Sequence, residues 1–128
     1  MTTIESYHQA IKARLIADPL VLRFEVRREG RGLSDGHLRA LLTLSGGSQL
    51  EFSEYVRLTE GQVEVISYSF HWADSDGTFI RRRDNVPHFM ELPGAPHHIH
   101  DGAESNVLPG TATTVATVLD EISRLLTD

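Results

Sequence analysis

The chain has 128 residues, a mass of 14.3 kDa and no cysteine, and its formal net charge is -6. We expect a single domain over residues 1–128, because 40% hydrophobic and 23% charged residues are typical of a folded globular protein. The missing cysteines exclude disulfides, thiol catalysis and sulfur-ligated zinc, and the acidic balance confines any nucleic-acid contact to a local patch. No apolar run reaches the roughly 20 residues that span a bilayer, so a cytoplasmic protein without membrane contact is expected.

Amphipathic spacing predicts a helix near each end of the chain. Residues 3–17 carry apolar side chains at three- and four-residue steps, with Thr2 and Glu5 spaced as a capping box and Pro19 closing the segment. Residues 112–126 repeat the same apolar spacing. These two helices are the segments able to cover one face of a sheet.

Between the helices the apolar period changes to two, which is typical of half-buried strands. The alternation predicts five strands, at residues 20–27, 37–44, 48–58, 62–72 and 78–84. Connections from the second strand onward are of hairpin length. The expected fold class is therefore α+β, a five-strand antiparallel meander sheet flanked by an N-terminal and a C-terminal helix.

Residues 85–110 hold four of the five prolines and follow no sustained apolar period. Loops of this length are usually functional or disordered. Because the segment also carries aromatic, aliphatic and four histidine side chains, we expect a long ordered Pro/His-rich loop that packs on the sheet before the last helix. Disorder is the alternative.

Histidine and arginine cluster in the second half of the sequence, where five of the seven histidines fall between positions 71 and 100. Histidine exchanges protons near neutral pH, and placing it beside arginine is costly unless an anion binds there. The run from Arg81 to Asn85 lies in the same region. An anion-binding site is therefore predicted, with a solvated edge strand blunted by charge as the alternative.

Strand alternation orients the side chains of the strand predicted over residues 78–84. Ile80, Arg82 and Asp84 share one face, and Ile80 is expected to point inward or into a cleft. We therefore expect Arg82 and Asp84 in the site and the intervening Arg81 and Arg83 toward solvent.

Glu54 lies in the middle of an apolar row on the strand predicted over residues 48–58. A carboxylate in such a row needs a cationic partner, or its pKa must rise. We expect Glu54 to orient His71 or Arg82, and a bulge that turns Glu54 outward is the alternative. On the next strand, Tyr68 belongs to an aromatic row that forms either core or a platform for stacking bases.

The segment from Pro96 to Asp101 permits a metal interpretation, because His98 and His100 point the same way in an extended chain, and Asp101 or His71 could complete the ligand shell. The spacing matches no helical zinc motif, however. No phosphate-binding loop, dinucleotide fingerprint or serine-elbow motif is present either. We therefore predict no metal and no cofactor.

Ordered sequence blocks over the last two thirds of the chain resemble the TumE family of toxin-antitoxin proteins. The blocks are Phe52-x-Glu54-Tyr55, Tyr68-Ser69-Phe70-His71, Arg82-x-Asp84-Asn85-x-Pro87-His88, Pro96-His97-His98-Ile99-His100 and Glu104-x-Asn106-Val107-x-Pro109. Phe89 stands where that family often shows a second histidine. The resemblance implies a toxin whose partner is a helix-turn-helix antitoxin of the TumA type.

A metal-free ribonuclease needs a base for the ribose 2′-hydroxyl, an acid for the leaving oxygen and a cation for the phosphorane. We predict that the catalytic residues are His71, Arg82, Asp84, His88 and His98. We predict that the substrate-binding residues are Glu54, Tyr68, Asn85, His97 and His100.

The expected function is thus a toxin that cleaves RNA through a His/Arg site without metal. One alternative is a non-catalytic module that docks the antitoxin, and another is a metal-dependent nuclease or hydrolase. RNA and a second copy of the chain, in a homodimer, are the other partners considered.

Overall fold

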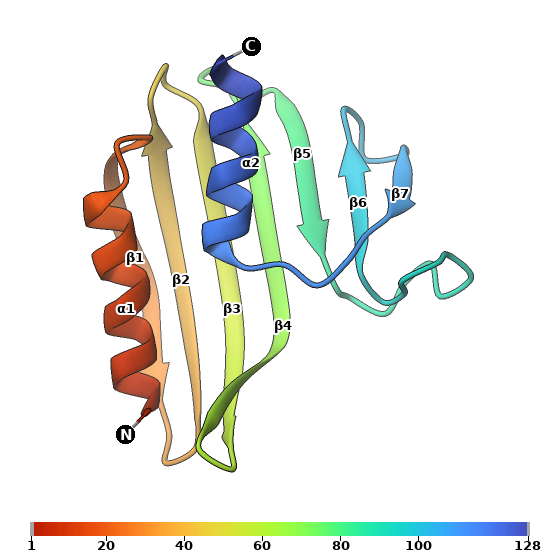
Figure 1. The fold of residues 1–128 in the computed structure, drawn as a ribbon. Coiled ribbons are helices and arrows are strands. Elements are labelled where there is room, and N and C mark those ends of the chain that lie inside the picture. Colours follow the sequence, from red (N-terminus) through yellow and green to blue (C-terminus); the bar gives the residue numbers. More distant parts are fainter. Residues whose placement is uncertain (1, 128) are drawn as a thin grey trace.

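The computed structural model describes residues 2–127, which form one sheet and two helices (Figure 1). The elements in chain order are α1 (Ile4–Ala17), β1 (Val21–Arg31), β2 (Asp35–Leu44), β3 (Gln49–Thr59), β4 (Gln62–Ala73), β5 (Phe79–Asp84), β6 (His98–Asp101), β7 (Val107–Pro109) and α2 (Val115–Thr127). The strands are ordered in the sheet as they are in the chain, and every neighbouring pair is antiparallel. The predicted α+β meander with a helix at each end is confirmed.

The sheet has seven strands, so the prediction of five was wrong. The two additional strands, β6 and β7, lie inside the Pro/His-rich segment and have only four and three residues. β6 pairs with β5, where His98 lies opposite Asp84 and His100 lies opposite Arg82. The apolar period missed β6 because its two buried side chains are histidines.

Helix α1 begins one residue later than its predicted capping box. Thr3, rather than Thr2, is the N-cap, and its hydroxyl accepts a hydrogen bond from the Ser6 backbone N–H at 2.9 Å. Ser6 completes the box in place of Glu5, because its hydroxyl accepts from the Thr3 backbone N–H at 2.8 Å. These two reciprocal hydrogen bonds form a capping box, which satisfies two backbone N–H groups at the start of the helix.

Both helices cover the same face of the sheet, and the hydrophobic core lies between them and the long central strands (Figure 1). The sheet contributes fully buried side chains such as Leu42, Phe52 and Phe70, which meet Leu15 of α1 and Leu119 of α2. Each such side chain stabilises the fold by about 1.5–3 kcal/mol. The opposite side of the sheet, which neither helix covers, is called the open face below.

The helices that the structure describes have 14 and 13 residues. Over residues 2–127, neither is long and apolar enough to cross a membrane.

Candidate functional site

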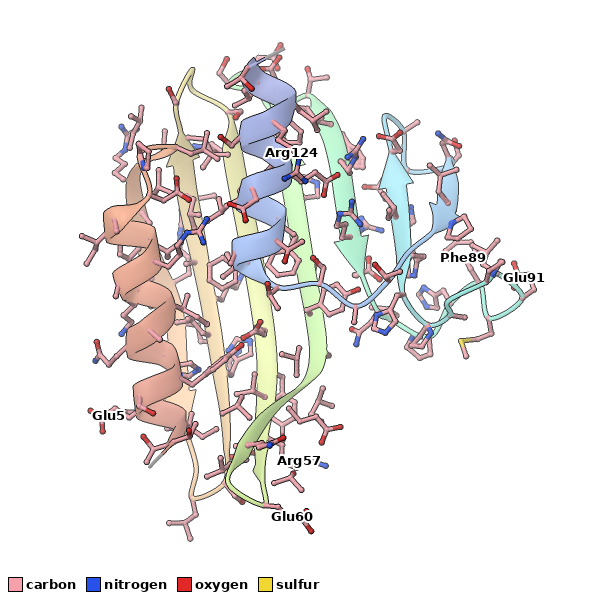
Figure 2. The ribbon with its side chains drawn as sticks, in the orientation of Figure 1. Glu5, Arg57, Glu60, Phe89, Glu91 and Arg124 are labelled. Atoms are coloured by element: carbon pink, nitrogen blue, oxygen red, sulfur yellow. The ribbon has the colours of Figure 1, made fainter. Side chains whose placement is uncertain are left out.

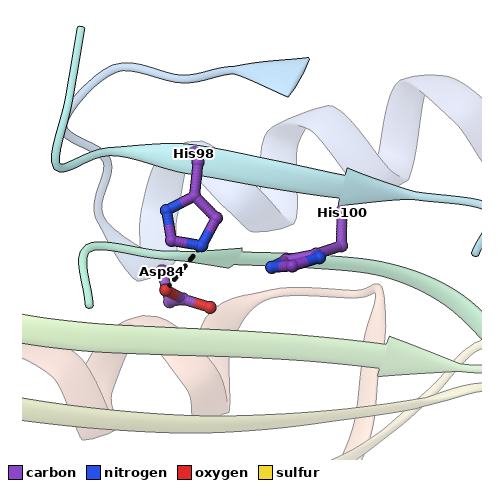
Figure 3. Close-up of side chains that lie close together, drawn as sticks. All are labelled: Asp84, His98 and His100. Carbon is purple, nitrogen blue, oxygen red and sulfur yellow. Dashed lines mark ion pairs between the residues drawn. The ribbon is translucent and has the colours of Figure 1, made fainter. Parts of the chain in front are cut away.

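Four polar side chains from β5 and β6 meet on the open face, and we call them the His/Asp cluster: Arg82, Asp84, His98 and His100. Asp84, His98 and His100 are 4%, 2% and 4% exposed, and one potential ligand atom from each lies within 4.8 Å of the others (Figure 3). The pairing of β5 with β6 produces this convergence, because each histidine lies opposite one of the two β5 residues. Burial of so many polar groups requires that they satisfy one another.

Backbone carbonyl groups fix the orientation of both histidine rings. Nδ1 of His98 lies 2.9 Å from the Pro96 carbonyl oxygen, and Nδ1 of His100 lies 2.7 Å from the Glu104 carbonyl oxygen. A carbonyl oxygen only accepts hydrogen bonds, so each Nδ1 must carry the proton. Nε2 of each ring therefore points into the cluster.

The two Nε2 atoms have different partners. Nε2 of His100 accepts a hydrogen bond from Nη2 of Arg82 at 3.1 Å, which identifies His100 as neutral in this structure. Nε2 of His98 lies 3.0 Å from Oδ1 of Asp84. This contact is attractive only with a proton on the ring nitrogen or on the carboxyl group. His98 and Asp84 therefore hold one proton between them.

Arg82 connects the cluster to the protein surface. Its Nε donates to Oδ2 of Asp84 at 3.0 Å, and its Nη1 donates to the exposed Glu104 carboxylate at 2.9 Å. The Arg82 side chain is 28% exposed, in contrast to its three buried neighbours. The guanidinium is thus the part of the cluster that an anion in solution reaches first.

Phe89 lies on the loop between β5 and β6 (Figure 2), and its ring packs against both histidine rings. Its ring centre lies 5.2 Å from that of His98 and 5.9 Å from that of His100, edge-on to each. Phe89 adopts a φ of 55°, which is uncommon for a residue with a side chain. Sequence reasoning gave no role to Phe89 or Glu104, although both lie within or beside the sequence blocks quoted above.

His71 lies next to the cluster, whereas His88 does not join it. His71 on β4 is half-buried and is the direct cross-strand partner of Arg82. His88 is exposed on the loop, where its ring contacts Phe89 at a centroid distance of 6.2 Å. Within residues 2–127, no hydrogen bond or ion pair links His88 to the four cluster residues.

Three of the predicted substrate-binding residues lie together at the end of β5, where they bind one another and the backbone. The Tyr68 hydroxyl is 3.0 Å from Nδ1 of His97, and the two rings stack at 5.8 Å. The Asn85 side chain accepts from the Tyr68 backbone N–H and donates to the Ile66 carbonyl, each at 3.0 Å. Tyr68 belongs to the core under the helices, so its ring is not free to stack a base.

Glu54 points into the core as its apolar row predicted, but the expected contact with His71 or Arg82 is absent from the described chain. Those two residues lie on the open face, whereas Glu54 is buried below α1 and accepts a hydrogen bond from the Tyr7 hydroxyl at 2.6 Å. Burial raises the pKa of Glu54, and it also raises the pKa of Tyr7. A bulge follows Glu54 at Tyr55 and Val56 without turning the carboxyl group outward.

The expectation that Arg81 and Arg83 face solvent was wrong. Both contact Glu121 of α2, with Nη2 of Arg83 at 2.6 Å from Oε2 of Glu121. A register shift where β5 pairs with β4 brings Ile80 to the core side together with these arginines. Arg82 consequently faces the opposite way from Ile80, a reversal that regular alternation does not predict.

An antiparallel sheet covered on one face, with a buried His/Asp/Arg cluster on the other, defines a small α+β protein with a candidate catalytic or metal-binding centre. The family model described as Toxin TumE matches residues 12–126. The chain belongs to the TumE toxin family, which implies the toxin component of a toxin-antitoxin system and an antitoxin partner. No curated protein and no solved structure matches the chain.

Proposed function

We propose that this toxin acts in the cytoplasm by cleaving RNA at the His/Asp cluster without a metal ion. The observation that supports the proposal is the position of Arg82, whose guanidinium donates to Asp84 of the proton-holding pair His98–Asp84 and whose cross-strand partner is His71. A partly exposed guanidinium beside groups that transfer protons is suited to a phosphodiester.

Each step of the cleavage has a residue to serve it. His71 takes the proton of the ribose 2′-hydroxyl, whose oxygen attacks phosphorus and forms a 2′,3′-cyclic phosphate. The bond from phosphorus to the 5′ oxygen breaks, and that oxygen receives the proton held by His98 and Asp84. Arg82 stabilises the charge on the phosphorane. His88, which is exposed on the loop between β5 and β6, is the second candidate for the base that takes the 2′-hydroxyl proton.

Access to His98 requires the loop to move, because this histidine is 2% exposed and Phe89 lies over it. Phe89 is itself 38% exposed and is the aromatic side chain nearest the two histidines. A displaced Phe89 ring could stack on a base of single-stranded RNA, the role first expected of Tyr68.

Incubation of the purified protein with total RNA, with and without EDTA, tests the proposal. Arg82→Ala and His98→Ala should each lower the cleavage rate at least about 100-fold, because each removes a transition-state contact or a proton donor. EDTA should leave the wild-type rate unchanged. Arg57→Ala is the matched control, since Arg57 lies on β3 beside the turn to β4 and outside the His/Asp cluster (Figure 2). Equal cleavage by all preparations would identify a contaminant and end the proposal.

The exposed loop favours a second candidate, a module that binds a helix-turn-helix antitoxin without catalysis. Val86, Phe89 and Met90 of this loop are 43%, 38% and 58% exposed, and exposed apolar side chains that form a contiguous patch mark a protein-binding surface. Loss of antitoxin binding in Met90→Asp, with no RNA turnover by the wild type, would favour this function. The homodimer considered as a possible assembly from the sequence stays untested.

A further inference from the structure

We infer that Asp84, His98 and His100 bind one divalent transition-metal ion, for which Zn²⁺ is the best-matched candidate. The inference goes beyond the proposed function, because metal binding is measurable whether or not the protein cleaves RNA. Only the effect of the ion on activity depends on that proposal.

The first observation is the donor set itself. Two imidazole nitrogens and one carboxylate oxygen lie within 4.8 Å of one another and are all buried. Zinc binds these atom types at about 2.0–2.2 Å, which in a tetrahedral shell places neighbouring ligand atoms about 3.4 Å apart.

The second observation is the way the histidines are held. Histidines that bind metal through one nitrogen donate the other ring N–H to a carbonyl or carboxylate, which fixes the tautomer. His98 and His100 both do this, through their Nδ1 contacts with the Pro96 and Glu104 carbonyl oxygens. Two independent backbone contacts therefore direct both Nε2 atoms into the cluster, where an ion would replace the Arg82 hydrogen bond at His100 and the shared proton at His98.

The third observation is that a cation already occupies part of this position. The Arg82 guanidinium donates to Nε2 of His100 and to Oδ2 of Asp84, two of the three proposed ligands. It stands in for the metal ion and shows that positive charge is stabilised there. Because Arg82 also binds the exposed Glu104, it can move toward the surface with that carboxylate when an ion enters.

Three protein ligands leave a fourth coordination position for water, on the side covered by Phe89. A bound ion takes the Nε2 atom of His98 and the Asp84 carboxylate, the two groups that hold the proton in the proposed cleavage, together with Nε2 of His100. Zinc should therefore inhibit RNA cleavage by this protein.

Titration of the EDTA-treated full chain with Zn²⁺ in a calorimeter, and with Co²⁺ by visible absorption, tests the binding directly. The wild type should bind one ion per chain, with the strong absorption of a four-coordinate cobalt centre. His98→Gln and His100→Gln should each weaken binding by more than about 100-fold, the upper end of the loss caused by changing a group behind a ligand. His37→Gln, which changes a histidine on β2 outside the cluster, is the matched control and should bind like the wild type.

Absence of stoichiometric binding by the folded wild type would overturn the inference, and so would unchanged binding by the double variant His98→Gln/His100→Gln. Circular dichroism of each variant separates lost ligands from lost folding. If Zn²⁺ binds and accelerates cleavage instead of inhibiting it, the metal-free mechanism fails while the metal site stands. If cleavage persists without any metal binding, the metal site fails alone.

Discussion

Two buried carboxyl groups, one on each face of the sheet, have opposite surroundings. Glu54 lies among apolar side chains with the Tyr7 hydroxyl as its hydrogen-bond donor, and its Oε2 has no partner within the described chain. Asp84 contacts His98, Arg82 and the Val86 backbone N–H, so both of its oxygens are bonded. Both groups are buried, but only the second arrangement gathers groups that exchange protons or bind ions. The partners, rather than burial alone, identify a functional site.

The largest expected effect is that of Asp84→Asn, which keeps the shape of the side chain and removes its charge. Arg82 and the proton on His98 then lose their anionic partner inside the protein, which should lower the free energy of unfolding by roughly 3 kcal/mol. Urea denaturation at pH 7 measures the change. Asp120→Asn on α2 is the control, because the exposed ion pair of Asp120 with Arg14 contributes about 1 kcal/mol or less. Similar losses in the free energy of unfolding for the two variants would show that the buried contacts of Asp84 are no stronger than the exposed ion pair of Asp120.

An intermediate effect is expected from Phe89→His, which places a fourth nitrogen donor over the cluster. Because the Phe89 ring already lies near both histidine rings, the new imidazole should reach the open coordination position and tighten zinc binding about tenfold. Calorimetric titration provides the measurement. Met90→His adds a histidine to the same loop at an exposed position, and its zinc affinity should equal that of the wild type. Identical zinc affinities for the wild type and both variants would show that a side chain at position 89 does not reach the proposed coordination position.

The smallest effect is expected from Glu54→Gln, which replaces a carboxyl group whose pKa is raised by burial. At pH 4 the free energy of unfolding should change by less than about 1 kcal/mol, because the amide oxygen still accepts from Tyr7. As the pH rises above the usual glutamate pKa of about 4.3, the unfolded wild type releases a proton that the folded wild type retains, since its Glu54 pKa is raised. The wild type therefore loses stability relative to the variant until the pH exceeds the folded pKa.

Urea denaturation of both proteins at a series of pH values between 4 and 8 checks this sign. The stability difference should move in favour of Glu54→Gln by at most about 1.4 kcal/mol per pH unit. A constant difference, or one that favours the wild type as the pH rises, would show that Glu54 is charged in the folded protein.

The sequence predicted those parts of the fold that follow an apolar period. The helices and β1 to β5 lie within a few residues of their predicted positions, except that β1 continues to Arg31. In the helices and β2 to β4 one side is buried against aliphatic or aromatic partners, whereas β1 has no fully buried residue. β6 was missed because histidines occupy its buried side, and the orientation of Ile80 was missed because a register shift leaves no mark on composition. Local patterns do not report such shifts.

The cluster was predictable in parts but not as a whole. Alternation placed His98 with His100, and Arg82 with Asp84, on common faces. The pairing of β5 with β6 joins the two sets, and this long-range contact is not encoded in any local spacing. Asp101 or His71 was therefore considered as the third ligand in the metal interpretation, whereas Asp84 is the carboxyl group that lies beside His98 and His100 in the structure.

The short length of β6 and β7 has a consequence for measurement. Strands of four and three residues at the end of a sheet have few backbone hydrogen bonds of their own, so the side chains that join His98 and His100 to β5 also hold this edge in place. A ligand that binds only the assembled cluster stabilises the edge by mass action. Amide hydrogen exchange of β6 should thus slow when the cluster is occupied, which allows candidate ligands to be screened without an assay of toxicity.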